Sequence, residues 1–262
     1  MAEMERIYTI ELHGLTLGYG ERVLMADASV GFGWGELTAL IGRNGTGKST
    51  LLRTIAGLAR AQKGTITISG DDVSSLTMKQ VASRIAFVST DDVRVQNLRV
   101  WDVVSLGRAP YTNWVGRLTE EDRVKVKESL ELVGMGGFVE ASMDSLSDGE
   151  RQRVMIARAL AQDTPIILLD EPTAFLDLPN KYEICLLLKR LAHKEGKCIL
   201  FSTHDLSIAI ELCDTIALIE GGEFHYGTAQ MLIESGAMQR LFEHTQIEFD
   251  KEVGGVRLKR TL

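Results

Sequence analysis

A glycine-rich segment carries the residue types that bind a nucleotide phosphate: residues 42–49 read GRNGTGKS and fit the pattern G-x-x-x-x-G-K-[ST]. Glycines let the backbone turn tightly and aim successive N–H groups at an anion. Lys48 can reach the β and γ phosphates, and the Ser49 hydroxyl can bind Mg²⁺. A glycine-rich turn without a ligand would have no comparable use for this lysine and serine, so we predict a phosphate site. Its residues are predicted to be Gly42, Asn44, Gly45, Thr46, Gly47, Lys48, Ser49 and Thr50, with Lys48 also taking part in catalysis.

Two acids follow an apolar run at residues 166–169, at the end of a predicted buried strand. In an open α/β sheet, ligands bind beyond the carboxyl ends of the strands, so Asp170 and Glu171 are expected to face the phosphate site. Asp170 is the natural ligand of Mg²⁺, through a water molecule, and Glu171 is the candidate that orients or deprotonates an attacking water. The alternative is an exposed acid pair that only caps the strand.

A histidine lies at the end of the next predicted strand, in the sequence Ser202-Thr203-His204-Asp205. A lone histidine usually has a structural role. Because this strand ends at the same edge of the sheet, we predict instead that His204 contacts the γ-phosphate or the water and acts in catalysis beside Glu171.

The elements that must position these residues are those of a covered parallel sheet. Residues 37–41 form a nearly unbroken apolar run that leads through the glycine-rich turn to a predicted helix at residues 48–56. Further buried strands are predicted at residues 84–88, 166–170, 198–202 and 215–219, with helices at 179–194 and 206–213. The opening stretches, residues 7–17 and 23–30, alternate apolar and polar residues as half-buried antiparallel strands do.

Strand patterns disappear between residues 90 and 161, where residues 100–106, 120–133 and 148–161 show helical periodicity instead. We interpret this stretch, about residues 90–161, as a helical subdomain inserted into a core of about residues 1–89 and 162–227, within a single domain of 262 residues. About residues 228–262 form a C-terminal extension with a helix-like stretch, a weakly alternating segment at 245–250 and a basic cluster at 257–260 that we interpret as solvated.

Composition narrows the function classes. A formal net charge of -7 and a pI near 5.4 argue against a protein that binds nucleic acid through a broad basic surface. No apolar run reaches the roughly 18 residues of a membrane-spanning helix, and the N-terminus lacks the features of a signal peptide, so we expect a cytosolic chain. Three cysteines without a CxxC pair fit reduced, buried thiols.

One further motif separates this sequence from other phosphate-loop enzymes: residues 146–150 read LSDGE, just ahead of a predicted helix. With it, the chain resembles the ATPases of ABC transporters over almost its whole length. The resemblance implies an α/β fold, a P-loop NTPase ABC cassette with a mixed sheet core, an antiparallel β subdomain and an inserted helical subdomain. It also implies that Ser147, Gly149 and Glu150 contact the γ-phosphate of an ATP held by a second copy, so that a homodimer closes over ATP and Mg²⁺. The alternative for Ser147 and Glu150 is a capping box, although a capped helix can still present N–H donors to an anion.

Two other segments match landmarks of the family. Tyr19, in the sequence Gly18-Tyr19-Gly20, resembles the aromatic residue that stacks on adenine, whereas a tyrosine in a turn is by itself more often structural. Residues 174–177, AFLD, resemble the segment that crosses the dimer interface after the catalytic glutamate, with Asp177 as its acid.

Two positions depart from the pattern of the family. Where the family has a glutamine that reaches Mg²⁺ and links the nucleotide to the permease, this chain has Thr90, and our hypothesis is that Thr90, Asp91 or Gln96 takes over part of that role. Unchanged ATP turnover of the permease complex after all three are replaced by alanine would contradict it. Asp148 stands where the family has glycine: its carboxylate suits a helix N-terminus but would repel an incoming γ-phosphate unless it turns to solvent or pairs with a cation.

The expected partners follow from a further resemblance. Residues 98–110, LRVWDVVSLGRAP, resemble the permease-facing segment of ATPases that serve iron-siderophore, haem and cobalamin importers. This resemblance implies a peripheral ATPase subunit on the cytoplasmic face of the cell membrane, coupled to a permease and indirectly to a substrate-binding protein, with no nucleic-acid partner. An ordinary amphipathic helix and loop is the alternative, and the cargo follows by analogy alone.

Two other functions stay open at this point. A soluble ABC ATPase acting in cluster assembly, translation or DNA repair is opposed by the permease-like segment and by the acidic balance of the chain. A nucleotide-binding module with little hydrolysis is suggested by Thr90 and Asp148. The presence of Lys48, Asp170 and Glu171 opposes that reading.

Overall fold

A six-stranded mixed sheet forms the centre of the computed structural model, which describes residues 8–89, 97–112, 116–243, 245–250 and 255–259. The strand order is β10-β9-β3-β8-β7-β6, and all neighbours are parallel except β10, which pairs antiparallel with β9. The strands are β3 (Leu37–Gly42), β6 (Ile85–Val88), β7 (Ile166–Leu169), β8 (Cys198–Ser202), β9 (Thr215–Glu220) and β10 (Glu223–Gly227). The five predicted parallel strands are therefore confirmed, whereas β10 was not foreseen.

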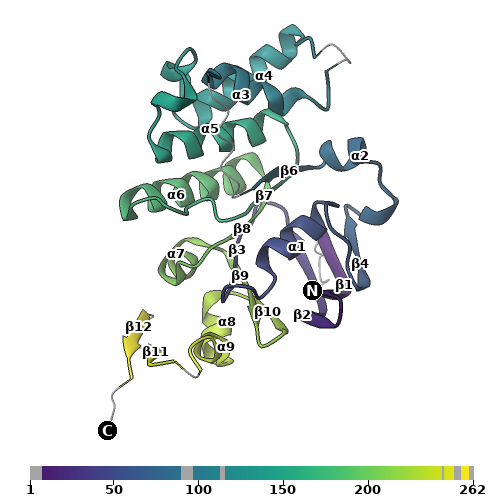
Figure 1. Ribbon diagram of the computed structural model, residues 1–262, viewed down its shortest axis with the longest axis vertical. Helices are drawn as coiled ribbons and strands as arrows, with labels where there is room; N and C mark the ends of the chain where they lie inside the picture. The colour runs from purple at the N-terminus through teal and green to yellow at the C-terminus, as the bar shows by residue number, and fades with distance from the viewer. Residues whose placement is uncertain (1–7, 90–96, 113–115, 244, 251–254, 260–262) are drawn as a thin grey trace, which may run out of the picture.

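Alternate residues of the central strands face two separate cores, as the pleat of a strand requires. Ile167 and Leu169 of β7 belong to one core, and Ile166 and Leu168 belong to the other. The first core is closed by helices on one face of the sheet (Figure 1): α5 (Asp148–Ala161), α6 (Leu178–Glu195) and α7 (Leu206–Leu212). The second core is closed by α1 (Lys48–Ile55) and by a second sheet.

This second sheet is antiparallel and has the strand order β2-β1-β4-β5. Its strands are β1 (Tyr8–Tyr19), β2 (Arg22–Gly33), β4 (Lys63–Ile68) and β5 (Asp71–Asp72), followed by the short helices η1 (Val73–Ser75) and α2 (Met78–Ala82). The alternation in the opening sequence correctly predicts β1 and β2. β4 and β5 were missed. Apolar side chains of β1, Leu12 and Leu17 among them, are buried against the same core as α1.

The segment between β6 and β7 contains helices joined by loops and no named strand among its described residues, as its periodicity predicts. It contains α3 (Val100–Ser105), η2 (Leu106–Arg108), α4 (Glu120–Leu132), η3 (Gly136–Phe138), η4 (Met143–Ser145) and α5. Figure 1 shows α3, α4 and α5 grouped at one end of the molecule, beyond the edge of the sheet that β6 and β7 form.

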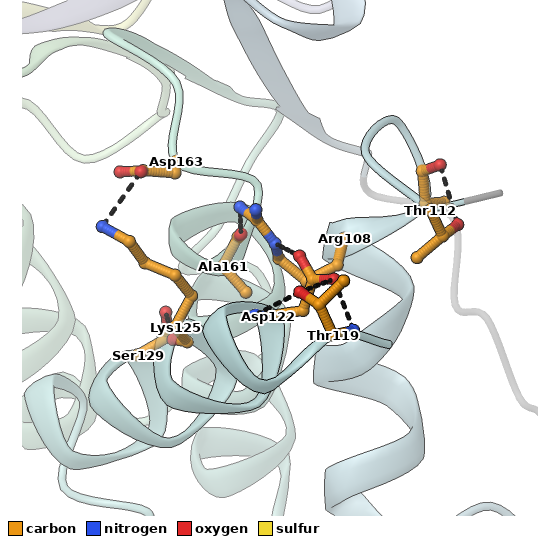
Figure 2. A network of polar contacts seen from close by, with 9 residues as sticks. Arg108, Thr112, Thr119, Asp122, Lys125, Ser129, Ala161 and Asp163 are labelled. Carbon is orange, nitrogen blue, oxygen red and sulfur yellow. Dashed lines mark hydrogen bonds and ion pairs between the residues drawn. The ribbon is translucent and has the colours of Figure 1, made fainter. Parts of the chain in front are cut away.

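A buried ion pair holds these helices together (Figure 2). Arg108 Nε donates to Asp122 Oδ1 at 2.8 Å, and the two side chains are only 7% and 5% exposed. Arg108 Nη1 also donates to the carbonyl oxygen of Ala161, the last residue of α5, at 2.9 Å. Asp122 Oδ2 accepts from the N–H and the hydroxyl of Thr119, the N-cap of α4, at 2.9 and 2.8 Å. One guanidinium thus joins η2 to the start of α4 and the end of α5.

The C-terminal part of the chain adds two short helices, α8 (Ala229–Glu234) and α9 (Ala237–Arg240), and a hairpin of β11 (Ile247–Asp250) and β12 (Gly255–Leu258). Residues 257–259 of the basic cluster are exposed, as predicted, but the interpretation as a simple solvated terminus is incomplete. Arg257 lies in β12 and forms ion pairs across the hairpin with Glu248 at 2.9 Å and Asp250 at 2.5 Å.

Two of the three cysteines are buried, as predicted from the composition, whereas Cys213 is only partly buried. Cys185, Cys198 and Cys213 are all free, and burial raises the pKa of the Cys185 and Cys198 thiols to about 12. These two are therefore protonated, unreactive side chains of the core. Among the described residues, no helix combines the length and the apolar composition needed to cross a membrane.

Candidate active site

The phosphate loop connects β3 to α1 at the carboxyl edge of the central sheet, as the glycine-rich motif predicts. Lys48, the first residue of α1, is only 5% exposed. Its Nζ donates to the carbonyl oxygens of Gly42 at 2.9 Å and Arg43 at 3.3 Å, so the ammonium group lies within the curve of the loop. The start of α1 adds the positive end of a helix dipole at the same place.

Two glycines of this loop are required by its geometry. A Cβ atom on Gly42 would lie 2.6 Å from Thr46 Oγ1 and 2.7 Å from the carbonyl oxygen of Ile219, distances that no side chain tolerates. Gly47 has a φ of 108°, a left-handed backbone that favours glycine, and it is the N-cap of α1. The pattern of glycines therefore follows from close backbone approach and from the turn into the helix.

Ser49 and Asp170, predicted to hold Mg²⁺, are in direct contact. Ser49 Oγ donates to Asp170 Oδ1 at 3.0 Å, and Asp170 is 3% exposed. A hydroxyl and a carboxylate oxygen beside a phosphate loop are the few protein oxygens with which Mg²⁺ is usually bound, the remaining ligands being water and substrate phosphate. The residues present thus fit the ion. The third predicted ligand, Thr90, lies outside the described residues, as do Asp91 and Gln96.

Burial lowers the pKa of Lys48, and the nearby carboxylates of Glu171 and Asp170 oppose this effect. The two acids thus help to keep the buried amine protonated. A protonated Lys48 can attract a polyphosphate to the loop.

Glu171 and His204 form a pair at the same edge of the sheet. Glu171 Oε1 and His204 Nε2 are 2.8 Å apart, and with Glu171 as a carboxylate the Nε2–H must be the donor. The side chains are 31% and 45% exposed, so both can reach a molecule from solvent. A cavity of about 700 Å³ opens beside them, lined also by Phe175 and by Phe242 and Val256 of the C-terminal extension. A carboxylate and an imidazole in this position can orient a water molecule and take its proton.

The LSDGE segment lies elsewhere in the chain. Ser147 is the N-cap of α5, and its N–H and hydroxyl donate to Glu150 Oε2 at 2.8 and 2.7 Å, which confirms the capping box. Gly149 lies against the side chain of Asn180 in α6. Within the described ranges, no hydrogen bond or ion pair joins Ser147, Gly149 or Glu150 to the phosphate loop, and Figure 1 shows α5 and α1 on opposite sides of the sheet.

The combination of this phosphate loop, acid pair and capped helix agrees with the sequence comparisons. The profile of the ABC transporter family matches residues 25–174. The chain belongs to the ABC transporter family. As an ABC cassette, it binds and hydrolyses ATP.

Known relatives agree with this assignment along most of the cassette. It is 39% identical, over 230 residues, to the iron(3+)-hydroxamate import ATP-binding protein FhuC of Bacillus subtilis (strain 168), covering 87% of this chain and 86% of that protein. A solved inward-facing ABC transporter described as of metal-chelate type superposes with a TM-score of 0.81 at 25% identity, covering 97% of this chain and 98% of that one. A solved dimeric bacterial ABC transporter cassette gives a TM-score of 0.71 at 29% identity, covering 84% and 98%.

The predicted adenine-stacking residue of the cassette lies close to the phosphate loop. Tyr19 is the last residue of β1, directly before the turn into β2, and 66% of its surface is exposed. Its hydroxyl is 2.9 Å from Thr50 Oγ1, a hydrogen bond that fixes the ring beside the start of α1. The ring is thus free to receive a flat ligand, and its role with adenine stays a prediction.

The two remaining acids of the cassette have local partners. Asp148 pairs with Arg151 in the first turn of α5, the arrangement with a cation that would reduce repulsion of a phosphate. Asp177 is the N-cap of α6, where its Oδ1 accepts from the Asn180 N–H at 3.0 Å. Just before it, Phe175 is 92% exposed.

Ser202 contacts both acids of the cassette and was given no role by the sequence. Its hydroxyl lies 2.7 Å from Asp170 Oδ1 and 2.8 Å from the Glu171 nitrogen. The signal that could have identified it is the pairing of two parallel strands, because the residue that ends β8 lies beside the residue that follows β7.

Proposed function

We propose that this cassette powers the uptake of a metal chelate, an iron-siderophore complex, haem or cobalamin, through a membrane permease. Two comparisons support this cargo class: the relative that is named for iron(3+)-hydroxamate import, and the structure described as a metal-chelate type transporter. The permease-like sequence of residues 98–110 points the same way. The cassette would be a peripheral subunit at the cytoplasmic face of the membrane, with a substrate-binding protein delivering the chelate to the permease.

ATP would bind along the edge where β3 ends. Tyr19 would stack on adenine, while the backbone N–H groups of the loop and the Lys48 ammonium would hold the phosphates. The full set of residues proposed for this half of the site is Gly42, Asn44, Gly45, Thr46, Gly47, Lys48, Ser49 and Thr50. Ser49 and Asp170, with Thr90 or a neighbour, would bind Mg²⁺, which when bound withdraws charge from the phosphates.

A second copy of the cassette would complete the site. Ser147, Gly149 and Glu150 start a helix whose N–H groups can contact an anion, yet they are separate from the phosphate loop of their own chain. Asp177 and the exposed Phe175 would lie at the same interface. The solved dimeric cassette to which this chain is similar supports a pair of copies.

Hydrolysis would depend on Glu171. Its carboxylate would orient the attacking water and accept its proton, and His204 would hold the carboxylate while reaching toward the γ-phosphate. Loss of the γ-phosphate would loosen the contact between the two copies. The helical subdomain, about residues 90–161 inserted between the core segments 1–89 and 162–227, would pass this movement to the permease.

The main support for ATP hydrolysis at this site is a pair of contacts near the phosphate loop. Ser49 bonds to Asp170, and Glu171 bonds to His204. The test is Glu171→Gln, in which the amide cannot take a proton. We expect ATP hydrolysis, measured as phosphate release, to fall by at least about 100-fold. ATP-dependent dimerisation, measured by sedimentation, should persist, because binding does not need the carboxylate.

The matched control is Glu195→Gln, which neutralises an exposed glutamate at the end of α6 and should leave turnover unchanged. Turnover of Glu171→Gln within about twofold of the unmodified protein would refute the assignment of the base. Co-purification of the cassette with ribosomes or a soluble scaffold, rather than with a membrane protein, would refute the role in transport.

A further inference from the structure

The last residue of β8 has a buried hydroxyl that touches both acids of the site. Ser202 is 0% exposed. The geometry points to Ser202 as a positioning residue for ATP hydrolysis, which sets the carboxylate of Asp170 and the backbone of Glu171 in one fixed arrangement. This inference rests on the proposed roles of Asp170 and Glu171.

The directions of the two hydrogen bonds are fixed by chemistry. The Glu171 N–H can only donate, so Ser202 Oγ accepts from it at 2.8 Å. The single proton of the Ser202 hydroxyl then goes to Asp170 Oδ1 at 2.7 Å, because an ionised carboxylate can only accept. One fully buried hydroxyl therefore satisfies a backbone donor and a carboxylate at once.

The strand pairing explains why this residue reaches both acids. β7 and β8 are parallel with Leu168 beside Leu200 and Leu169 beside Phe201, so the next pair in register is Asp170 and Ser202. Alternate residues share a face, and Leu168 and Leu200 both belong to the core that α1 covers. The side chains of Asp170 and Ser202 thus point to the face that carries the phosphate loop.

Ser202 determines how Asp170 presents its carboxylate. The two side chains that donate to this carboxylate, Ser49 and Ser202, both bond to Oδ1, and among the described residues none bonds to Oδ2. Ser49 belongs to the phosphate loop and is itself a proposed Mg²⁺ ligand, so its hydroxyl has a second use. Ser202 is then the donor that keeps Oδ1 in place, and Oδ2 would be available to hold Mg²⁺, through water or directly.

Ser202 also supports an unusual backbone at Glu171. This residue has a φ of 49°, in the left-handed region that a residue with a side chain seldom adopts. The turn follows directly after β7 and directs the Glu171 side chain to His204. The hydrogen bond from the Glu171 N–H to Ser202 stabilises this turn, so loss of the hydroxyl would misplace the base as well as the carboxylate.

The test compares Ser202→Ala with the unmodified protein. We expect kcat for ATP hydrolysis to fall about tenfold, while KM for ATP in the presence of Mg²⁺ rises by no more than about threefold, because most of the phosphate binding depends on the loop and not on this hydroxyl. A second readout does not depend on turnover. The affinity for fluorescently labelled ADP should be unchanged without Mg²⁺, and the gain in affinity that Mg²⁺ gives should shrink about threefold.

Two further variants separate positioning from general loss of a buried hydroxyl. Ser202→Thr keeps the hydroxyl and should restore kcat to within about threefold of the unmodified protein. Thr164→Val removes another buried hydroxyl, 1% exposed and bonded to the Ile166 carbonyl at 2.9 Å, at the opposite end of β7, and should leave kcat unchanged. If Ser202→Ala folds poorly, Ser202→Cys keeps the volume with much weaker hydrogen bonds and should show the same loss of kcat.

The inference is overturned if kcat of Ser202→Ala stays within about twofold of the unmodified protein, or if Thr164→Val loses as much activity. Either result would leave the proposed function intact, provided that Glu171→Gln still abolishes hydrolysis. Full activity of Glu171→Gln would instead remove the proposed role of Glu171, whatever Ser202→Ala does.

Discussion

Two polar networks of this cassette contain similar side chains but serve different purposes, one in the active site and the other in holding helices together. The edge network lies at the carboxyl ends of the strands and consists of Ser49, Asp170, Glu171, Ser202 and His204. The insert network lies among the helices between β6 and β7 and consists of Arg108, Thr119, Asp122 and Ala161 (Figure 2). Each has an acid as its centre, and each joins elements that are distant in the sequence.

The insert network is closed. Both oxygens of Asp122 accept hydrogen bonds, and the Arg108 guanidinium bonds to Asp122 and to the end of α5. The Cζ atom of Arg108 also lies over the ring of Tyr111, 4.1 Å from its centroid. Burial acts to raise the pKa of Asp122, but the N–H of Thr119, the Arg108 guanidinium and the Thr119 hydroxyl outweigh it and lower the pKa. The acid and the guanidinium of this network are buried and paired with each other, so the network joins structural elements and presents no free carboxylate to a ligand.

The edge network is open. Glu171 and His204 are about one-third and one-half exposed, and Oδ2 of Asp170 has no hydrogen bond to any described residue. Its free groups face the phosphate loop, where Lys48 is buried. The edge network has groups exposed to solvent and can therefore bind a ligand. The insert network has its acid and its guanidinium buried and paired, and it only connects helices.

The largest effect expected from this comparison is a loss of stability when the insert network is broken. Asp122→Asn would leave the Arg108 charge buried without its counter-charge, which costs about 3 kcal/mol of the free energy of unfolding. Urea denaturation followed by circular dichroism measures this loss. ATP turnover per folded molecule should stay the same, because the edge network is untouched.

A neighbouring exposed pair provides the control for this prediction. Lys125 Nζ and Asp163 Oδ2 are 3.0 Å apart, with side chains 36% and 48% exposed (Figure 2). Asp163→Asn should therefore cost less than about 1 kcal/mol. Equal losses of unfolding free energy in the two variants would show that the burial of the Arg108–Asp122 pair does not increase its contribution to stability.

The acid dependence of stability sharpens the same test. Because the pKa of Asp122 is lowered in the folded state, its charge contributes stability above the pKa of the unfolded chain, about 3.9, and this contribution is lost as pH falls through the folded value. The gap in unfolding free energy between the unmodified protein and Asp122→Asn should be constant from about pH 5 to 7 and shrink below about pH 4. A gap that stays unchanged at low pH would contradict the ion pair as its cause.

The sequence alone predicted most of the edge network, since its residues follow apolar runs or lie in a recognisable glycine motif. Lys48, Asp170, Glu171 and His204 each come directly after a predicted strand or loop, and the parallel sheet brings those ends together. The role of Ser202 could not be predicted from the sequence, because it depends on the register of β7 against β8 and on the backbone of Glu171.

The insert network could not have been predicted in this way. Arg108 and Asp122 are 14 residues apart, and Arg108 and Ala161 are 53 apart, with no local pattern linking them. The strands β4 and β5 were missed for a related reason: β4 is exposed at its first three residues and β5 has only two, so neither shows a clear alternation of apolar and polar residues.

The smallest effect concerns a pair with features of both networks. Asp148 and Arg151 are paired within the chain, as in the insert network, yet they are 65% and 38% exposed at the helix start proposed to meet the second nucleotide. Since Arg151 already offsets much of the negative charge, Asp148→Gly should tighten ATP-dependent dimerisation only about threefold, roughly 0.7 kcal/mol. Sedimentation with ATP in the Glu171→Gln background measures this change. Arg151→Gln, which leaves Asp148 without its cation, should weaken dimerisation. Weaker dimerisation of Asp148→Gly would mean that the carboxylate supports the closed dimer, through the cap of α5, more than it repels the phosphate.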